Sequence, residues 1–167
     1  MMERACQEAQ QVLGEREPTL DDLEKMPLAM QIWKETLRLY PSADTMSVRV
    51  ALRDVQIGGF PIPKGTLVLI SPDVLHQRND VFPDALQWRP ERFAAQNEKS
   101  LPRYSYLPFG GGARVCIGQH FATTEAQLVL STLLRQVRFE NLNTDVQPQA
   151  VFTMRPDRPV RLKVYKN

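Results

Sequence analysis

The segment from Phe109 to Gly118, FGGGARVCIG, places one cysteine in a glycine-rich turn immediately before an amphipathic helical pattern. The cysteine is Cys116, one of only two in 167 residues. The N-terminus of a helix carries a partial positive charge, which stabilises a nearby thiolate. The pattern therefore favours Cys116 as a thiolate ligand of iron.

The neighbours of Cys116 fit the same hypothesis. Gly112 and Gly118 allow positive φ and a close approach of the backbone to a flat ligand. Phe109 can shield the sulfur from water, and Arg114 is placed to bind an anionic group such as a carboxylate. Together these residues suit an iron porphyrin, with sulfur on one face and propionates at the edge.

These residues also have simpler interpretations. Cys116 alone is compatible with a buried structural cysteine. The glycines at 110–112 suggest a phosphate loop, but the sequence has no G-x-x-x-x-G-K-[ST] pattern. His76 and His120 have no paired metal-ligand spacing, so we expect both to be non-ligands.

Composition bounds the class of protein. A chain that is 43% hydrophobic with a formal net charge of +2 predicts one globular domain and no nucleic-acid partner. Cys6 lies on an apolar helical stripe, so we expect it in the core. The two cysteines form no C-x-x-C pair, which favours a reducing compartment such as the cytoplasm. No apolar run approaches the roughly 20 residues that span a bilayer, which predicts a soluble protein.

Periodicity predicts a mainly α fold with a small β region. A capping-box pattern with Asp in place of Glu starts a short helix at 19–22, and Pro27 opens a longer one. Strands are expected where apolar and polar residues alternate, and the last two are expected to pair as a terminal hairpin. The expected helices are 2–13, a short one from 19, 28–39 and 119–137; the expected strands are 48–52, 55–57, 66–71, 151–154 and 160–165, with a loop at 141–149.

Three motifs in this order resemble those of the cytochrome P-450 family. Glu35-Thr-Leu-Arg38 resembles its E-x-x-R helix motif, and Pro90-Glu-Arg-Phe93 its P-E-R-F segment. The positions Phe109, Gly112, Arg114, Cys116 and Gly118 match the haem-binding signature F-x-x-G-x-R-x-C-x-G. The resemblance runs over essentially the whole chain. It implies the C-terminal, proximal haem-binding part of that fold, with a buried salt-bridge triad of Glu35, Arg38 and Arg92.

The resemblance also implies a function. Members of the family bind haem b through a cysteine thiolate and insert one oxygen atom of O2 into a small organic substrate. Electrons arrive from a redox partner, a ferredoxin or a flavoprotein reductase. Charge and proximity to Cys116 suggest that Lys99, Arg103 and Arg114 help to dock such an acidic donor, although plain solvated charges are an equal alternative.

Departures from the family pattern limit these expectations. The chain is well under half of a family catalytic domain, so 1–167 is expected to be one incomplete domain. The distal helix with its acid–alcohol pair would precede Met1, so no catalytic residue is assigned within this chain. We expect the chain alone to be inactive and poorly soluble, and membrane anchoring stays open. Met46 aligns near a propionate-binding position, with Arg49 and Arg53 further on.

Two alternative functions remain. A relative on the same scaffold that rearranges or dehydrates peroxides needs neither O2 nor a redox partner, and the residues that distinguish it belong to the distal helix. A truncated, non-catalytic product would bind haem weakly or not at all.

Overall fold

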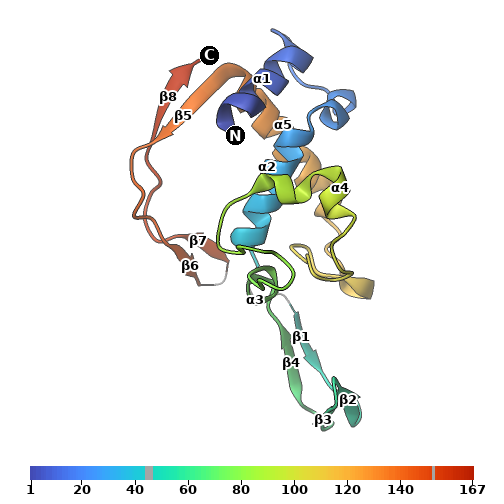
Figure 1. The fold of residues 1–167 in the computed structure, drawn as a ribbon. Coiled ribbons are helices and arrows are strands. Elements are labelled where there is room, and N and C mark those ends of the chain that lie inside the picture. The colour runs from blue at the N-terminus through green and yellow to red at the C-terminus, as the bar shows by residue number, and fades with distance from the viewer. Residues whose placement is uncertain (44–46, 152) are drawn as a thin grey trace.

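A layer of helices forms the centre of the molecule. The computed structural model describes residues 1–43, 47–151 and 153–167. Within these ranges, the fold is mainly helical with four two-stranded antiparallel sheets, which confirms the predicted fold class. Helices α1, α2 and α5 lie together at the top of Figure 1, near both termini. The bounds of the main helices are Met2–Leu13 for α1, Pro27–Leu39 for α2 and Gln119–Gln136 for α5.

The boundaries of the first helices follow the local sequence signals. Gly14 follows the end of α1, and Pro27 is the first residue of α2, as predicted. Between them, the 3₁₀ helix η1 (Leu20–Lys25) starts at the expected capping box. The backbone N–H and the hydroxyl of Thr19 donate to Asp22 Oδ2 at 3.0 and 2.8 Å.

The main core lies where α1, η1, α2 and α5 meet. Cys6 belongs to it and is 5% exposed, which confirms its prediction as a core residue. Helix α1 packs along α5, and α2 contacts both of them. Small side chains on α1 let the helices approach closely. The buried members of the cluster are Ala5, Cys6, Ala9, Leu13, Leu23, Met26, Ala29 and Leu134.

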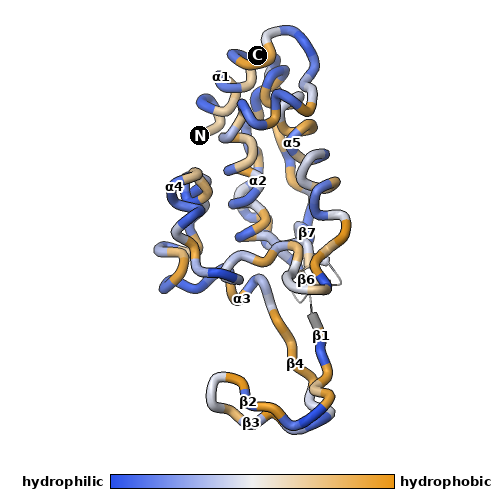
Figure 2. Tube along the Cα trace, turned by 90° about the vertical axis from the view of Figure 1, so that its right-hand side faces the viewer, coloured by the Kyte–Doolittle hydropathy of each residue, from blue (hydrophilic) through white to orange (hydrophobic). Residues whose placement is uncertain are grey.

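A β arm extends away from the helices (Figure 1). Strands β1 (Ser47–Val50) and β4 (Leu67–Ile70) pair antiparallel, and β2 (Val55–Ile57) pairs with β3 (Phe60–Ile62) at its tip. Strands β1, β2 and β4 agree with the predicted ones within two residues, whereas β3 was not predicted. Apolar residues run along this arm in Figure 2, and many of them are solvent-exposed, Leu52 at 86%.

Short elements connect the arm to the long helix α5. They are α3 (Pro72–His76), η2 (Pro90–Phe93), α4 (Ala95–Glu98) and η3 (Gly112–Arg114). Phe82, Ala85 and Phe93 form a second buried cluster, with Tyr106 packed against it. Helix α2 contacts both α3 and η2, so it joins the helical core to this irregular region.

The predicted terminal hairpin is wrong. Strand β8 (Leu162–Lys166) pairs with β5 (Val137–Asn141), which directly continues α5 and was not predicted. The intervening β6 (Pro148–Ala150) and β7 (Met154–Pro156) pair with each other, so the expected loop ends earlier than predicted. Alternation indicates that a segment is extended, but the partner is set by the path of the chain. None of the described helices combines the length and apolar character needed to cross a bilayer.

Candidate functional site

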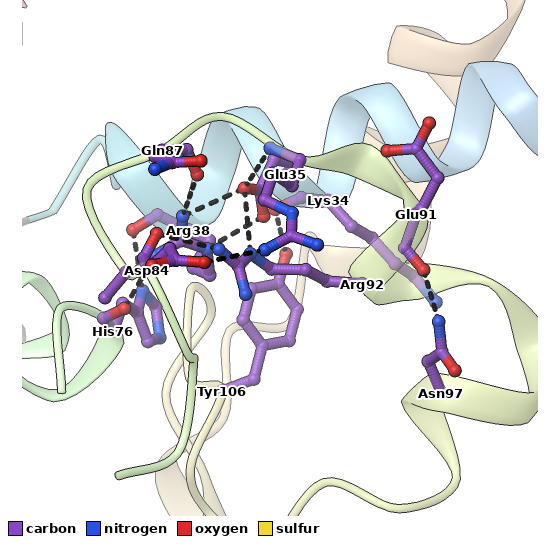
Figure 3. A network of polar contacts seen from close by, with 12 residues as sticks. Lys34, Glu35, Arg38, His76, Asp84, Gln87, Glu91, Arg92, Asn97 and Tyr106 are labelled. Carbon is purple, nitrogen blue, oxygen red and sulfur yellow. Dashed lines mark hydrogen bonds and ion pairs between the residues drawn. The ribbon is translucent and has the colours of Figure 1, made fainter. Parts of the chain in front are cut away.

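Glu35 and Arg38 form a buried, bidentate ion pair on α2 (Figure 3). Arg38 Nε donates to Glu35 Oε2 at 2.8 Å, and Arg38 Nη2 donates to Oε1 at 2.9 Å. Residues three apart share one face of a helix, so the pair is local in origin. Both side chains are fully removed from solvent, and such a pair needs further partners to offset its desolvation.

Arg92 joins this pair from η2. Its Nε lies 3.4 Å from Glu35 Oε1, an ion-pair distance without hydrogen-bond geometry. Its Nη2 donates to the Asp84 carbonyl at 2.8 Å, and the Arg89 N–H donates to Glu35 Oε1 at 2.7 Å. Burial lowers the pKa of Arg92, and the charge of Glu35 opposes this effect. The predicted triad of Glu35, Arg38 and Arg92 is therefore confirmed.

Two further hydrogen bonds of the Arg38 guanidinium go to backbone carbonyls outside α2. Nη1 donates to the His76 carbonyl at 2.7 Å, and Nη2 donates to the Gln87 carbonyl at 3.2 Å. Its guanidinium carbon lies 5.2 Å from the centroid of the Phe82 ring. One arginine thus ties α2 to two points of the irregular region.

Tyr106 and His76 belong to the same network; sequence reasoning missed Tyr106 and considered His76 only as a non-ligand of metal. The Tyr106 hydroxyl donates to the Lys34 carbonyl at 2.9 Å, and its ring lies 4.7 Å from Phe93. Burial raises the pKa of Tyr106, and the charges of Glu98 and Glu35 add to the rise. The sequence signal for Tyr106 was a tyrosine three residues before Phe109. A buried tyrosine packs its ring against apolar neighbours and hydrogen-bonds through its hydroxyl.

The loop from Phe109 to Cys116 folds back on itself. The Cys116 N–H donates to the Phe109 carbonyl at 2.9 Å, and the Gly110 N–H donates to the Leu107 carbonyl at 3.1 Å. Gly112 has φ of 71°, which only glycine adopts at little cost. The loop therefore closes through backbone bonds across a left-handed turn.

Cys116 presents a free thiol at the surface just before α5. Its carbonyl accepts a hydrogen bond from the Gln119 N–H at 3.3 Å. A Cβ added at Gly118 would lie 3.8 Å from Cys116 Sγ, so glycine leaves one side of the sulfur open. Helix α5 starts at Gln119, three residues after Cys116, so its positive N-terminal end follows the thiol closely along the chain.

The residues around Cys116 fit a flat, largely apolar ligand that carries a metal and an anionic edge. Apolar side chains flank the thiol in sequence and are solvent-exposed, with Ile117 fully exposed and Phe121 at 73%. Within the described ranges, the exposed Arg114 side chain makes no hydrogen bond or ion pair, so its charge is available. Phe109, at the start of the loop, is half-buried.

The other candidate residues lie elsewhere. Met46 falls outside the described residues, and Arg49 lies on the β arm, where it donates to its neighbour's carbonyl at 3.1 Å. Arg103 packs over the Tyr104 ring and donates to its hydroxyl at 2.8 Å. His120 occupies the first turn of α5, as predicted. In the part of the chain that the structure describes, no three His, Cys, Asp or Glu side chains are grouped to hold a metal ion.

The chain was compared with known proteins. The family model described as "Cytochrome P450" matches residues 1–164. The chain is 39% identical to cytochrome P450 3A12 of Canis lupus familiaris over 150 residues, which cover 88% of this chain and 30% of that protein. It is 40% identical to cytochrome P450 4V2 of Mus musculus over 137 residues, which cover 81% of this chain and 26% of that protein.

A solved structure resembles the fold closely. The retinoic acid-bound cyanobacterial CYP120A1 matches with a TM-score of 0.92 and 32% identity. The match covers 99% of this chain and 38% of the other. The chain thus spans about a third of the length of each of these three proteins.

Proposed function

The chain belongs to the cytochrome P450 family, and we propose that it forms the haem-holding part of a haem-thiolate monooxygenase. Members of this family are haem-containing oxidoreductases that act on small organic substrates with electrons from redox partners. Cys116, a free thiol on a closed glycine loop at the start of α5, is the observation that carries the proposal. Residues 1–167 are then one incomplete domain of that enzyme.

In this proposal, the Cys116 thiolate would hold haem b by ligating its iron. Gly112 and Gly118 keep the backbone close to the porphyrin, and Arg114 binds a propionate through its available charge. Phe109 limits the access of water to the sulfur. The haem, when bound, supplies the oxygen chemistry, and the protein supplies ligation and electrostatics. The network of Glu35, Arg38 and Arg92 holds the irregular region against α2.

Insertion of one oxygen atom of O2 into an organic substrate is the proposed reaction of the whole enzyme. The residues that activate O2 are assigned outside this sequence, so the chain alone is expected to be inactive. A cavity of about 440 Å³ between Tyr40 and strands β6 and β7, with Val146 and Met154 in its wall, is mostly apolar and suits part of a small organic substrate.

The electron donor is proposed to be an acidic ferredoxin or flavoprotein reductase. Arg103 and Arg114 are exposed cations on the segment that contains Cys116, and Lys99 precedes them. Such cations speed the encounter with an acidic protein and lose this effect at high salt. The need for a reduced, unpaired thiol at Cys116 favours a reducing compartment such as the cytoplasm.

Haem titration tests the proposal. We expect the chain, titrated with haemin, reduced and exposed to carbon monoxide, to show the strongly red-shifted Soret band of thiolate-ligated haem. Cys116→Ala should abolish this band, while Cys6→Ala, which changes a core cysteine, should retain it. Survival of the band in Cys116→Ala would overturn the assignment.

A chimaera supports the same test with a complete pocket. The chain replaces the matching 38% of the cyanobacterial relative, and the spectrum is measured with and without Cys116→Ala. If neither the chain nor the chimaera binds haem, the truncated, non-catalytic alternative is favoured instead.

A further inference from the structure

We propose that His76 is a positioning residue for the loop that carries Cys116. Its imidazole fixes Leu107, two residues before this loop, relative to helix α2. The step from loop position to iron ligation rests on the proposed function. The step from His76 to the loop rests on the contacts of the chain alone.

The two ring nitrogens of His76 bind two distant parts of the backbone. Nδ1 lies 3.2 Å from the Arg38 carbonyl, and Nε2 lies 2.8 Å from the Leu107 nitrogen. A carbonyl only accepts and a backbone N–H only donates. The ring must therefore be neutral, with its proton on Nδ1 and a bare Nε2 that accepts from Leu107.

The position of the ring is fixed from several sides. His76 is fully buried, and its own carbonyl accepts from Arg38 Nη1 at 2.7 Å. The ring packs against Tyr106 at 5.1 Å between centroids, and meets the Phe82 ring edge-on at 6.4 Å. His76 and Arg38 thus exchange two hydrogen bonds, and the side chain has little freedom to follow the loop if the loop moves.

Hydrogen bonds in series lead from His76 to Cys116. Leu107 donates to the imidazole and accepts from the Gly110 N–H at 3.1 Å. The Phe109 carbonyl, between these two residues, accepts from the Cys116 N–H at 2.9 Å. Displacement of Leu107 would therefore move the backbone that orients Cys116.

Among the described residues, His76 is the one side chain that hydrogen-bonds to the backbone of residues 107–118. The Tyr106 hydroxyl anchors the preceding residue to Lys34 at 2.9 Å, but makes no bond within the loop. Loss of a buried acceptor leaves its backbone donor without a partner, which costs more than the bond itself contributes. His76 should thus matter more to the loop than its packing alone implies.

The first test uses the haem-free chain labelled with ¹⁵N. The His76 ring is expected to be protonated on Nδ1 at neutral pH, and the Leu107 amide to exchange slowly. In His76→Phe, which keeps an aromatic ring but no nitrogen, we expect exchange at Leu107, Gly110 and Cys116 to rise roughly tenfold or more relative to the amides of α1.

Two further variants separate positioning from packing. His76→Gln places an amide oxygen near the position of Nε2, and should keep the loop amides within a few-fold of the native chain. Phe82→Leu disturbs the packing around the ring without touching a loop hydrogen bond, and should speed all core amides alike. The proposal would be overturned if the His76 ring were protonated on Nε2. It would also be overturned if His76→Phe raised the amide exchange rate of Leu107 no more than the rates of the α1 amides.

The second test measures the haem ligand. In the haem-loaded chain or chimaera, His76→Phe is expected to lose the thiolate-type carbon monoxide band in favour of a band without the red shift. His76→Gln and Phe82→Leu should retain it, and equal losses in all three variants would contradict positioning. If native protein shows no thiolate band, the proposed function fails, whereas amide exchange still decides the role of His76.

Discussion

Glu35 and Arg38 face each other across one turn of α2 and bond through both carboxylate oxygens, at 2.8 and 2.9 Å. The pair is fully buried, and each of the two groups has further hydrogen-bond partners. Glu35 also accepts from the Arg89 N–H, and Arg38 also donates to the His76 and Gln87 carbonyls. A pair of this kind is better understood as specifying which segments pack on α2 than as a net source of stability.

Removing one member of this pair should be strongly destabilising. Arg38→Met leaves the Glu35 carboxylate buried without its counter-ion, and we expect a loss of about 3–5 kcal/mol in the free energy of unfolding. Urea unfolding of the haem-free chain measures it. The control is Arg78→Met, which breaks the exposed pair with Asp80 and should cost less than about 1 kcal/mol. Equal effects of the two changes would contradict the inferred role of the buried pair.

Stability should fall in mild acid because of His76. Burial lowers the pKa of His76 to about 4 from an ordinary value of 6.5. The positive charge of Arg38 also lowers this pKa, whereas the hydrogen bond to the Arg38 carbonyl raises it. Between these pH values the unfolded chain binds a proton that the folded chain does not. The contribution of His76 to the free energy of unfolding is therefore fully present above pH 6.5. It is lost as the pH falls toward 4, by roughly 3 kcal/mol in all.

Urea unfolding at pH 7 and pH 4.5 measures this decline. His76→Gln has no titrating ring, so its stability should decline less between the two pH values. The difference between the two chains therefore isolates the effect of His76. Burial raises the pKa of the Tyr106 hydroxyl, which packs against the ring, so this group stays protonated throughout the window. The hydrogen bond from Arg16 holds the pKa of the Asp22 carboxyl low. The stability that Asp22 contributes is therefore lost only at a pH below this window. Parallel pH profiles would exclude His76 as the cause.

The two cysteines should differ sharply in reactivity. Cys116 is exposed, whereas Cys6 is 5% exposed in the helical core. Under native conditions we expect one thiol to react quickly with iodoacetamide and the second only after unfolding. Cys116→Ala should remove the fast reaction, and bound haem should slow it in the native sequence. Two equally fast thiols would show that the helical core opens readily.

Two glycines of the loop should respond differently to alanine. Gly112 has φ of 71° and space around a new Cβ, so Gly112→Ala should cost only its backbone strain, about 1–2 kcal/mol. Gly118 has φ of −85°, which alanine accepts, but the new Cβ would sit 3.8 Å from Cys116 Sγ. Gly118→Ala should therefore leave the unfolding free energy nearly unchanged and slow alkylation of Cys116. A larger stability loss at Gly118 than at Gly112 would contradict these roles.

Local features of the structure were accessible from the sequence because neighbouring residues produce them. The capping box of Thr19 and Asp22 and the pairing of Glu35 with Arg38 depend on residues three positions apart. The burial of Cys6 followed from a helical apolar stripe. Periodicity placed α5, although it overran the helix by one residue, at Val137, where β5 begins.

Strand partners were not accessible in the same way. Strand β8 alternates as expected, but alternation is equally compatible with β7 or β5 as a partner. The structure pairs it with β5, because that strand leaves the end of α5 and runs beside the C-terminus. The pairing depends on where a preceding helix ends in space, and no short sequence window contains that information.

The sequence by itself determined the chemistry of the site: a thiol at Cys116, a cation at Arg114, glycines that permit the turn, and an acid–base pair on one helix face. Only the tertiary structure decided that His76, far along the chain from Leu107, supports this turn. A histidine outside any motif has no local partner to reveal it. Its role arises when folding buries the ring and places its Nε2 as the acceptor of the Leu107 N–H.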